Sequence, residues 1–194
     1  MHLVVGLGNP GERYARTRHN IAWWVLEELA ARHAATESPG DTTYRARQVR
    51  VAGHAVTLLQ PLTFMNASGE AVAAWRSRNG QEAGLLVLSD DVYLPLGMLR
   101  VRASGSSGGH RGLESIETVV GGREYARLRI GVGAAENAAA LKTHVLDEFA
   151  PAEAPVLEAV VRRAADCTAV WVSEGALGAM NQFNRRVRQE ETET

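Results

Sequence analysis

The order of apolar and polar positions along the chain predicts strands alternating with helices. Short apolar runs at 3–7 and 85–89, bounded by glycine or aspartate, are typical of buried strands. Apolar residues recur with helical spacing over 20–33 and over a longer segment, 155–174, which ends at Gly175. Segments 44–51 and 55–60 flank Gly53 and His54, a pair that predicts a tight hairpin turn.

The remaining segments indicate a mixed architecture without a domain boundary. Strands are predicted at 99–103 and 127–132, and helices at about 66–79 and 112–120, with a last basic helix reaching about 188. No repeat or linker divides the chain. We therefore expect one α/β domain over residues 1–189, with a mixed, mostly parallel central sheet flanked by helices. The acidic end, 190–194, is expected to be a short disordered tail.

Composition indicates an ordinary cytoplasmic protein. Of the 194 residues, 45% are hydrophobic and 22% charged, which is typical of a globular domain with its own core. No apolar stretch is long enough to span a membrane, and the N-terminus does not resemble a signal peptide. The single cysteine, Cys167, cannot form an internal disulfide, so a reducing compartment is expected. The net charge of −1 neither favours nor excludes a nucleic-acid partner.

A glycine motif near the N-terminus, Gly6-Leu7-Gly8-Asn9-Pro10-Gly11, matches the G-x-G-x-x-G pattern of dinucleotide-binding folds. Its context argues against that function. Pro10 disfavours helical geometry at Asn9, where the phosphate-binding helix should begin. Residues 12–18 also lack an apolar stripe that could pack such a helix on a sheet. We interpret the motif as a turn.

A second loop, Gly105-Ser106-Ser107-Gly108-Gly109, matches the G-x-S-x-G nucleophile elbow of α/β-hydrolases. That fold requires an acid and then a histidine after the serine, but only glutamates in predicted helices or loops lie between Ser107 and His144, the last histidine. The loop is therefore interpreted as flexible and rich in small residues. The histidines show no H-x-x-x-H spacing, and one cysteine excludes C-x-x-C, so no metal site is expected.

Four polar residues fall where an α/β fold usually builds its site, just beyond predicted strands or before a helix. Each has an alternative structural role: Asn9 in a turn, His19 on the surface, Asn66 as a helix cap and Asp90 in a solvated turn. Together they would supply a general base, a carboxylate that orients it, and amide groups that hold a substrate.

Several motifs, in order along nearly the whole chain, carry a specific resemblance. The sequence resembles bacterial peptidyl-tRNA hydrolases at Gly6-Leu7-Gly8-Asn9-Pro10-Gly11, Thr17-Arg18-His19-Asn20, Phe64-Met65-Asn66, Asp90-Asp91, Gly108-Gly109-His110 and Arg127-Leu128-Arg129. The resemblance implies hydrolysis of the ester between a peptide and tRNA, which recycles the tRNA. It implies a monomer that uses no metal or organic cofactor.

The resemblance also implies roles for individual residues. His19 would take a proton from water, Asp90 would fix the histidine tautomer, and Asn9 and Asn66 would hold the peptide and the developing oxyanion. Two further groups are candidates for contact with the substrate. Around the 3′ end these are Tyr14, Phe64, Met65, His110 and Arg111. Toward the acceptor-stem phosphates they are Arg100, Arg102 and Arg129.

One departure from the family pattern keeps alternatives open. The family usually has asparagine after the histidine of its fourth motif, whereas this chain has Arg111. A non-catalytic tRNA- or RNA-binding relative is therefore one alternative, and a small-molecule esterase with the same water-activating pair is another.

Overall fold

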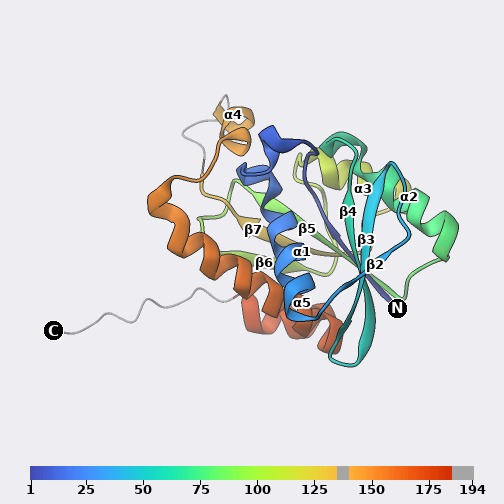
Figure 1. The fold of residues 1–194 in the computed structure, drawn as a ribbon. Coiled ribbons are helices and arrows are strands. Elements are labelled where there is room, and N and C mark those ends of the chain that lie inside the picture. The colour runs from blue at the N-terminus through green and yellow to red at the C-terminus, as the bar shows by residue number, and fades with distance from the viewer. Residues whose placement is uncertain (135–139, 185–194) are drawn as a thin grey trace.

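A seven-stranded sheet runs through the centre of the structure, a computed structural model that describes residues 1–134 and 140–184 (Figure 1). In spatial order its strands are β2 (Thr36–Ser38), β3 (Tyr44–Val51), β4 (His54–Pro61), β1 (His2–Gly6), β5 (Gly84–Asp91), β7 (Ala126–Gly131) and β6 (Leu99–Arg102). The four strands from β4 to β7 are parallel, and the outer pairings β2–β3, β3–β4 and β6–β7 are antiparallel. The predicted mixed sheet with a parallel centre is confirmed.

Helices cover both faces of the sheet, as predicted. In Figure 1, α1 (Ile21–Arg32) and α5 (Ala154–Phe183) lie on the near face, and α2 (Ser68–Asn79) and α3 (Arg111–Val120) lie behind the sheet. Each pair of helices closes its own apolar core, one around Leu26, Leu128 and Trp171 and the other around Leu7, Trp75 and Ile116. None of the described helices is both long and apolar enough to cross a membrane.

Two elements were not predicted. β2 has three residues and α4 (Leu141–Leu146) six, too short to give a clear periodic signal. The predicted end of the long helix at Gly175 is confirmed: Gly175 leaves helical geometry at φ 75° and kinks α5, and a second helical segment follows it under the same label. The last part of the predicted basic helix and the predicted tail, 190–194, lie outside the described residues.

The N-terminal glycines bring α1 close to the end of β1. A Cβ atom on Gly8 would lie 2.6 Å from the Trp23 ring. The Trp23 indole also donates a hydrogen bond to the Gly6 carbonyl at 3.0 Å. Helix packing therefore explains this glycine spacing, in agreement with its interpretation as a turn rather than a nucleotide loop.

Candidate active site

A cleft of 510 Å³ opens beyond the carboxyl ends of the parallel strands. β1 leads to Asn9, β5 ends at Asp90 and Asp91, and β4 leads to Met65 and Asn66. Strand ends of a parallel sheet meet at one edge, which brings together residues far apart in sequence. Every candidate residue named from the sequence lines this cleft except Arg100 and Arg102.

A buried carboxylate joins two histidines at the base of the cleft. The Asp90 side chain is 2% exposed, and its Oδ1 lies 2.7 Å from His19 Nδ1 and 2.9 Å from His110 Nε2. The prediction that Asp90 serves a solvated turn is therefore wrong, and so is a surface role for His19, whose side chain is 15% exposed. The predicted approach of His19 to Asp90 is present, whereas the contact of His110 with Asp90 has no signal in residue spacing.

Electrostatics favour an ionised Asp90 and a basic His19. Burial alone would raise the pKa of Asp90, but the two histidines more than offset it and hold that pKa well below its ordinary range. Burial also lowers the pKa of His19, but the charge of Asp90 and its hydrogen bond outweigh burial and raise the pKa above 6.5. An ionised Asp90 accepts the Nδ1–H proton of neutral His19, which leaves Nε2 as the basic nitrogen.

The protonation of His110 follows from its backbone contacts. Its Nδ1 accepts from the backbone N–H groups of Gly112 at 3.2 Å and Leu113 at 3.4 Å, at the start of α3. The proton of the neutral ring is then on Nε2, which donates it to Asp90. His19, Asp90 and His110 offer ligand atoms within 4.8 Å of one another, a spacing that could suit a metal ion. A metal would need an unprotonated Nε2 on His110, so this hydrogen-bond pattern favours a proton network instead.

His19 lies in a 3₁₀ turn, η2 (Arg18–Asn20), that is fixed on both sides. Arg18 pairs with Glu153 at 2.7 Å and donates to the Val132 carbonyl at 2.9 Å. Asn20 is fully buried and makes two hydrogen bonds of 2.9 Å with the backbone N–H and C=O of Asn9. Asn20 thus joins the base-bearing turn to the loop after β1, a role that sequence reasoning missed.

Replacing Asn20 with alanine should destabilise the fold by about 1–3 kcal/mol, because the buried backbone groups of Asn9 lose their partners. It should also lower kcat, since both Asn9 and His19 would be less well fixed. Urea unfolding and steady-state kinetics measure the two effects. Asn79→Ala, which removes a hydrogen bond within the exposed end of α2, is the matched control. Wild-type stability of the Asn20 variant would contradict the assigned role.

Asn9 presents one free end of its amide to the cleft. Its Oδ1 accepts the Met65 backbone N–H at 2.9 Å, which fixes the orientation of the side chain. Within the part of the chain that the structure describes, the Asn9 Nδ2 has no acceptor. Asn66 is exposed, and no capping bond of its side chain accompanies α2, so the helix-cap alternative is wrong. Both amides are therefore available to a ligand.

Aromatic and apolar side chains surround these polar groups. Tyr14 and Phe64 meet edge to face with ring centroids 6.4 Å apart, and Met65 is buried beneath the cleft. The Phe64 ring is 57% exposed and Tyr93 is 68% exposed, and both line the cleft, so it offers aromatic surface to a ligand. Three residues of α4 complete the cleft, Leu141, Val145 and Leu146, none of which was named as a site residue from the sequence, although Val145 and Leu146 belong to a stretch that resembles the C-terminal part of the family.

A line of arginines leads from the cleft across the edge of the sheet. Arg129 lines the cleft, and its Nε lies 3.0 Å from Asp91 Oδ2, an ion pair by distance without a well-directed hydrogen bond. In the β6–β7 register Arg100 is opposite Arg129 and Arg102 is opposite Arg127, so all four point to one face. Arg100 and Arg102 are exposed there. The structure thus places the three predicted phosphate contacts on one face of the sheet.

Arg111 begins α3 at the rim of the cleft. It is exposed and also lines a neighbouring groove of 340 Å³, together with Asn66 and Glu114. A cation in the first turn of a helix opposes the helix dipole. The helix therefore does not stabilise the Arg111 charge, which indicates that its guanidinium serves a contact outside α3.

The glycine–serine loop does not supply a nucleophile. The Ser107 hydroxyl lies 3.4 Å from Glu114 Oε1 and accepts the Gly109 N–H at 3.3 Å, and no described histidine contacts it. Ser107 is 8% exposed. Rejection of the elbow interpretation is supported, and in this structure several hydrogen bonds anchor the loop.

Comparison with known proteins agrees with this geometry. A sequence model of the peptidyl-tRNA hydrolase family matches residues 3–192. A peptidyl-tRNA hydrolase of Chloroflexus aggregans is 45% identical over 186 residues, covering 95% of this chain and 99% of its relative. The crystal structure of a peptidyl-tRNA hydrolase from Acinetobacter baumannii superposes with a TM-score of 0.86 at 33% identity, covering 95% of this chain and 94% of that one.

Proposed function

Because the chain belongs to the peptidyl-tRNA hydrolase family, we propose that it cleaves the ester between a peptide and the 3′-terminal ribose of tRNA, which recycles the tRNA. The observation that carries this proposal is the 2.7 Å contact between His19 Nδ1 and the buried Asp90 carboxylate, in a cleft also lined by Asn9 and Asn66. This is the base, orienter and amide-donor set that ester hydrolysis by water needs.

The chemistry follows from the free Nε2 of His19. This nitrogen takes a proton from water as the water oxygen attacks the ester carbonyl, and a tetrahedral intermediate with an oxyanion forms. Asn9 and Asn66 stabilise that oxyanion and the peptide through their amide N–H groups. Asp90 stabilises the imidazolium that His19 becomes. When the intermediate collapses, His19 returns the proton to the ribose oxygen, releasing tRNA and a peptide with a free carboxyl group.

Around this centre we assign the remaining side chains to substrate binding. Tyr14, Phe64 and Met65 pack against the peptide and the terminal nucleoside, and Arg111 donates to a phosphate or a peptide carbonyl at the rim. Arg100, Arg102 and Arg129 contact acceptor-stem phosphates. His110 acts on Asp90 rather than on the substrate, which revises the role inferred for it from the sequence.

A comparison of two substrates tests the proposal. For the wild-type protein, kcat/KM for N-acetyl-aminoacyl-tRNA should exceed kcat/KM for the same N-acetyl-aminoacyl ester of adenosine. Raising the salt from about 50 to 200 mM should lower only the tRNA value, because phosphate contacts release counterions. Equal values for both substrates would instead favour a small-molecule esterase, and no turnover of either would favour a non-catalytic RNA-binding protein.

Charge reversal at Arg102 should raise KM for peptidyl-tRNA more than it lowers kcat, because the residue is exposed on β6 and lies outside the cleft. Each lost phosphate contact should flatten the salt dependence of kcat/KM by about one unit of log–log slope. Steady-state kinetics of Arg102→Glu at several salt concentrations measure both effects. Arg50→Glu, an exposed arginine on β3, is the control. An unchanged KM would remove Arg102 from the RNA-binding surface.

Three further expectations stay predictions: a monomer, a reaction without metal or organic cofactor, and a cytoplasmic location. The location is supported by Cys167, which is buried and unpaired.

A further inference from the structure

A second arginine of β7, Arg127, has no place in the cleft. Its side chain is 1% exposed, and its guanidinium stacks over the Tyr125 ring at 4.2 Å. Arg129, two residues later on the same face, lines the cleft instead. Burial of a guanidinium is costly unless hydrogen bonds satisfy it, so the contacts of Arg127 indicate its role.

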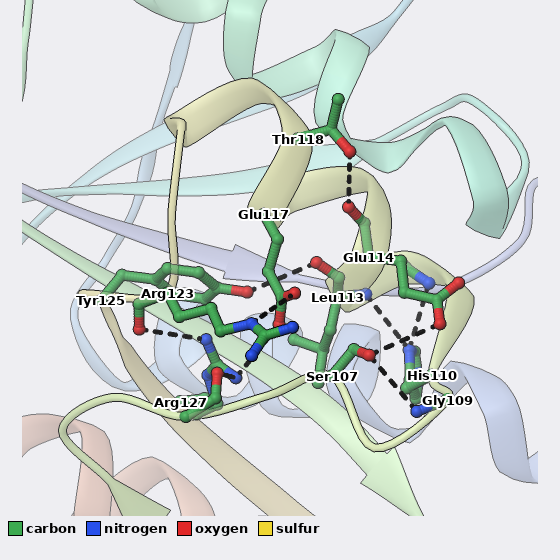
Figure 2. A network of polar contacts seen from close by, with 12 residues as sticks. Ser107, Gly109, His110, Leu113, Glu114, Glu117, Thr118, Arg123, Tyr125 and Arg127 are labelled. Carbon is green, nitrogen blue, oxygen red and sulfur yellow. Dashed lines mark hydrogen bonds and ion pairs between the residues drawn. The ribbon is translucent and has the colours of Figure 1, made fainter.

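Those contacts join the glycine–serine loop to α3. The Arg127 guanidinium donates to the Gly105 carbonyl. It also donates to the Arg123 carbonyl at 3.3 Å and lies 3.4 Å from Glu117 Oε1 (Figure 2). Gly105 belongs to the loop before α3, and Glu117 lies in the second half of that helix. One side chain on β7 therefore holds two points of the chain, one on each side of His110.

The loop benefits from such an anchor because few backbone hydrogen bonds hold it: among the described residues, the Gly105 N–H donates to the Arg123 carbonyl at 3.4 Å and the His110 N–H to the Ser107 carbonyl at 3.2 Å. Gly105, Gly108 and Gly109 have φ values of 141°, 62° and 82°. Glycine adopts such values readily, but it has more conformational freedom than other residues when unanchored, so ordering these three residues costs more entropy. Near its end, the Ser107 hydroxyl and carbonyl hold Gly109 and His110, which orders the turn into α3 (Figure 2). Leu113 and Ile116 pack α3 on the sheet. Arg127 adds a polar tie that joins both the loop and α3 to β7, the strand beside the one from which Asp90 projects.

We propose that Arg127 is a positioning residue for the hydrolytic site. By holding Gly105 and Glu117, it places His110 so that Nε2 donates to Asp90 Oδ1, and the carboxylate is thereby fixed for His19. Arg127 itself touches neither substrate nor His19. The inference rests on the proposed function, because it takes His19 and Asp90 as the reacting pair.

A double-mutant cycle tests the proposal. Arg127→Lys keeps the charge but loses the planar fork, and Arg127→Met removes the charge at similar length. Misplacing a reacting group by about 1 Å can reduce rate up to ~100-fold, so we expect kcat to fall about 10- to 100-fold in Arg127→Met, with KM changed less than about twofold. Arg127→Lys should retain part of the lost rate. In a His110→Ala background the Arg127 substitutions should cause no further loss.

Arg123→Gln is the matched control, because Arg123 pairs with the same Glu117 from the exposed side and should leave kcat unchanged. Full activity in Arg127→Met would overturn the proposal. It would also be overturned if the kcat loss of the double variant equalled the product of the Arg127 and His110→Ala losses, because Arg127 would then act independently of His110. If Arg127→Met does not fold, the cycle with Arg127→Lys gives the same decision. An active His19→Ala enzyme would overturn the proposed base separately, because the cycle compares only Arg127 and His110.

Discussion

Replacing His19 with alanine should lower kcat by roughly two to four orders of magnitude, while KM for peptidyl-tRNA stays within a fewfold of wild type. In the proposed mechanism the imidazole supplies the general base, and His110, the other histidine on Asp90 among the described residues, directs its proton to Asp90 and accepts the Gly112 N–H at Nδ1. The residual rate would come from the cleft and its amide donors, which still hold the ester and its oxyanion.

Single-turnover release of N-acetyl-amino acid from tRNA measures this loss without interference from product release. His33→Ala is the matched control, since His33 ends α1 away from the cleft. Circular dichroism should show both variants folded. A His19→Ala enzyme with wild-type kcat would require another source of activated water and would refute the assigned base.

The sequence predicted most elements of this fold because their signals are local. Apolar runs bounded by glycine or aspartate marked β1 and β5, and helical spacing marked α1 and α5. The elements it missed are β2, with three residues, and α4, with six. Each is shorter than two periods of its strand or helix pattern. α4 nevertheless contributes Leu141, Val145 and Leu146 to the cleft, a role that helical or strand periodicity could not indicate for so short an element.

The candidate site was predicted by residue type and position, including the His19–Asp90 pair, but not in its other connections. His19, Asp90, Asn9 and Asn66 each follow a strand or precede a helix, and the fold brings those ends together. Which nitrogen of His110 carries the proton depends on the Gly112 and Leu113 amides, a tertiary detail that spacing does not contain. Arg127 and Arg129 look alike in sequence, yet one is buried in a structural network and the other lines the cleft.

Replacing Asp90 with asparagine should lower kcat by about three to four orders of magnitude and move the acid limb of the pH profile to lower pH. Wild-type His19 has a pKa above 6.5, because Asp90 outweighs burial. In the proposed mechanism the neutral imidazole is the active base, so activity should rise with pH through that pKa. Without the carboxylate, burial remains and the pKa of His19 falls below its ordinary value. The proton that inhibits the enzyme is then lost at lower pH.

The loss in rate and the shift in pKa have separate causes, and the pH profile of kcat/KM resolves them. An asparagine amide can donate to His19 Nδ1, which would place the imidazole proton on Nε2 and block proton abstraction from water at every pH. The plateau should therefore fall even where His19 is fully neutral. Asp166→Asn, at an exposed ion pair with Arg32, should change neither quantity. An acid limb that stays in place in Asp90→Asn would mean that Asp90 does not set the pKa of the base. A plateau that stays high would mean that the tautomer is fixed by some other group.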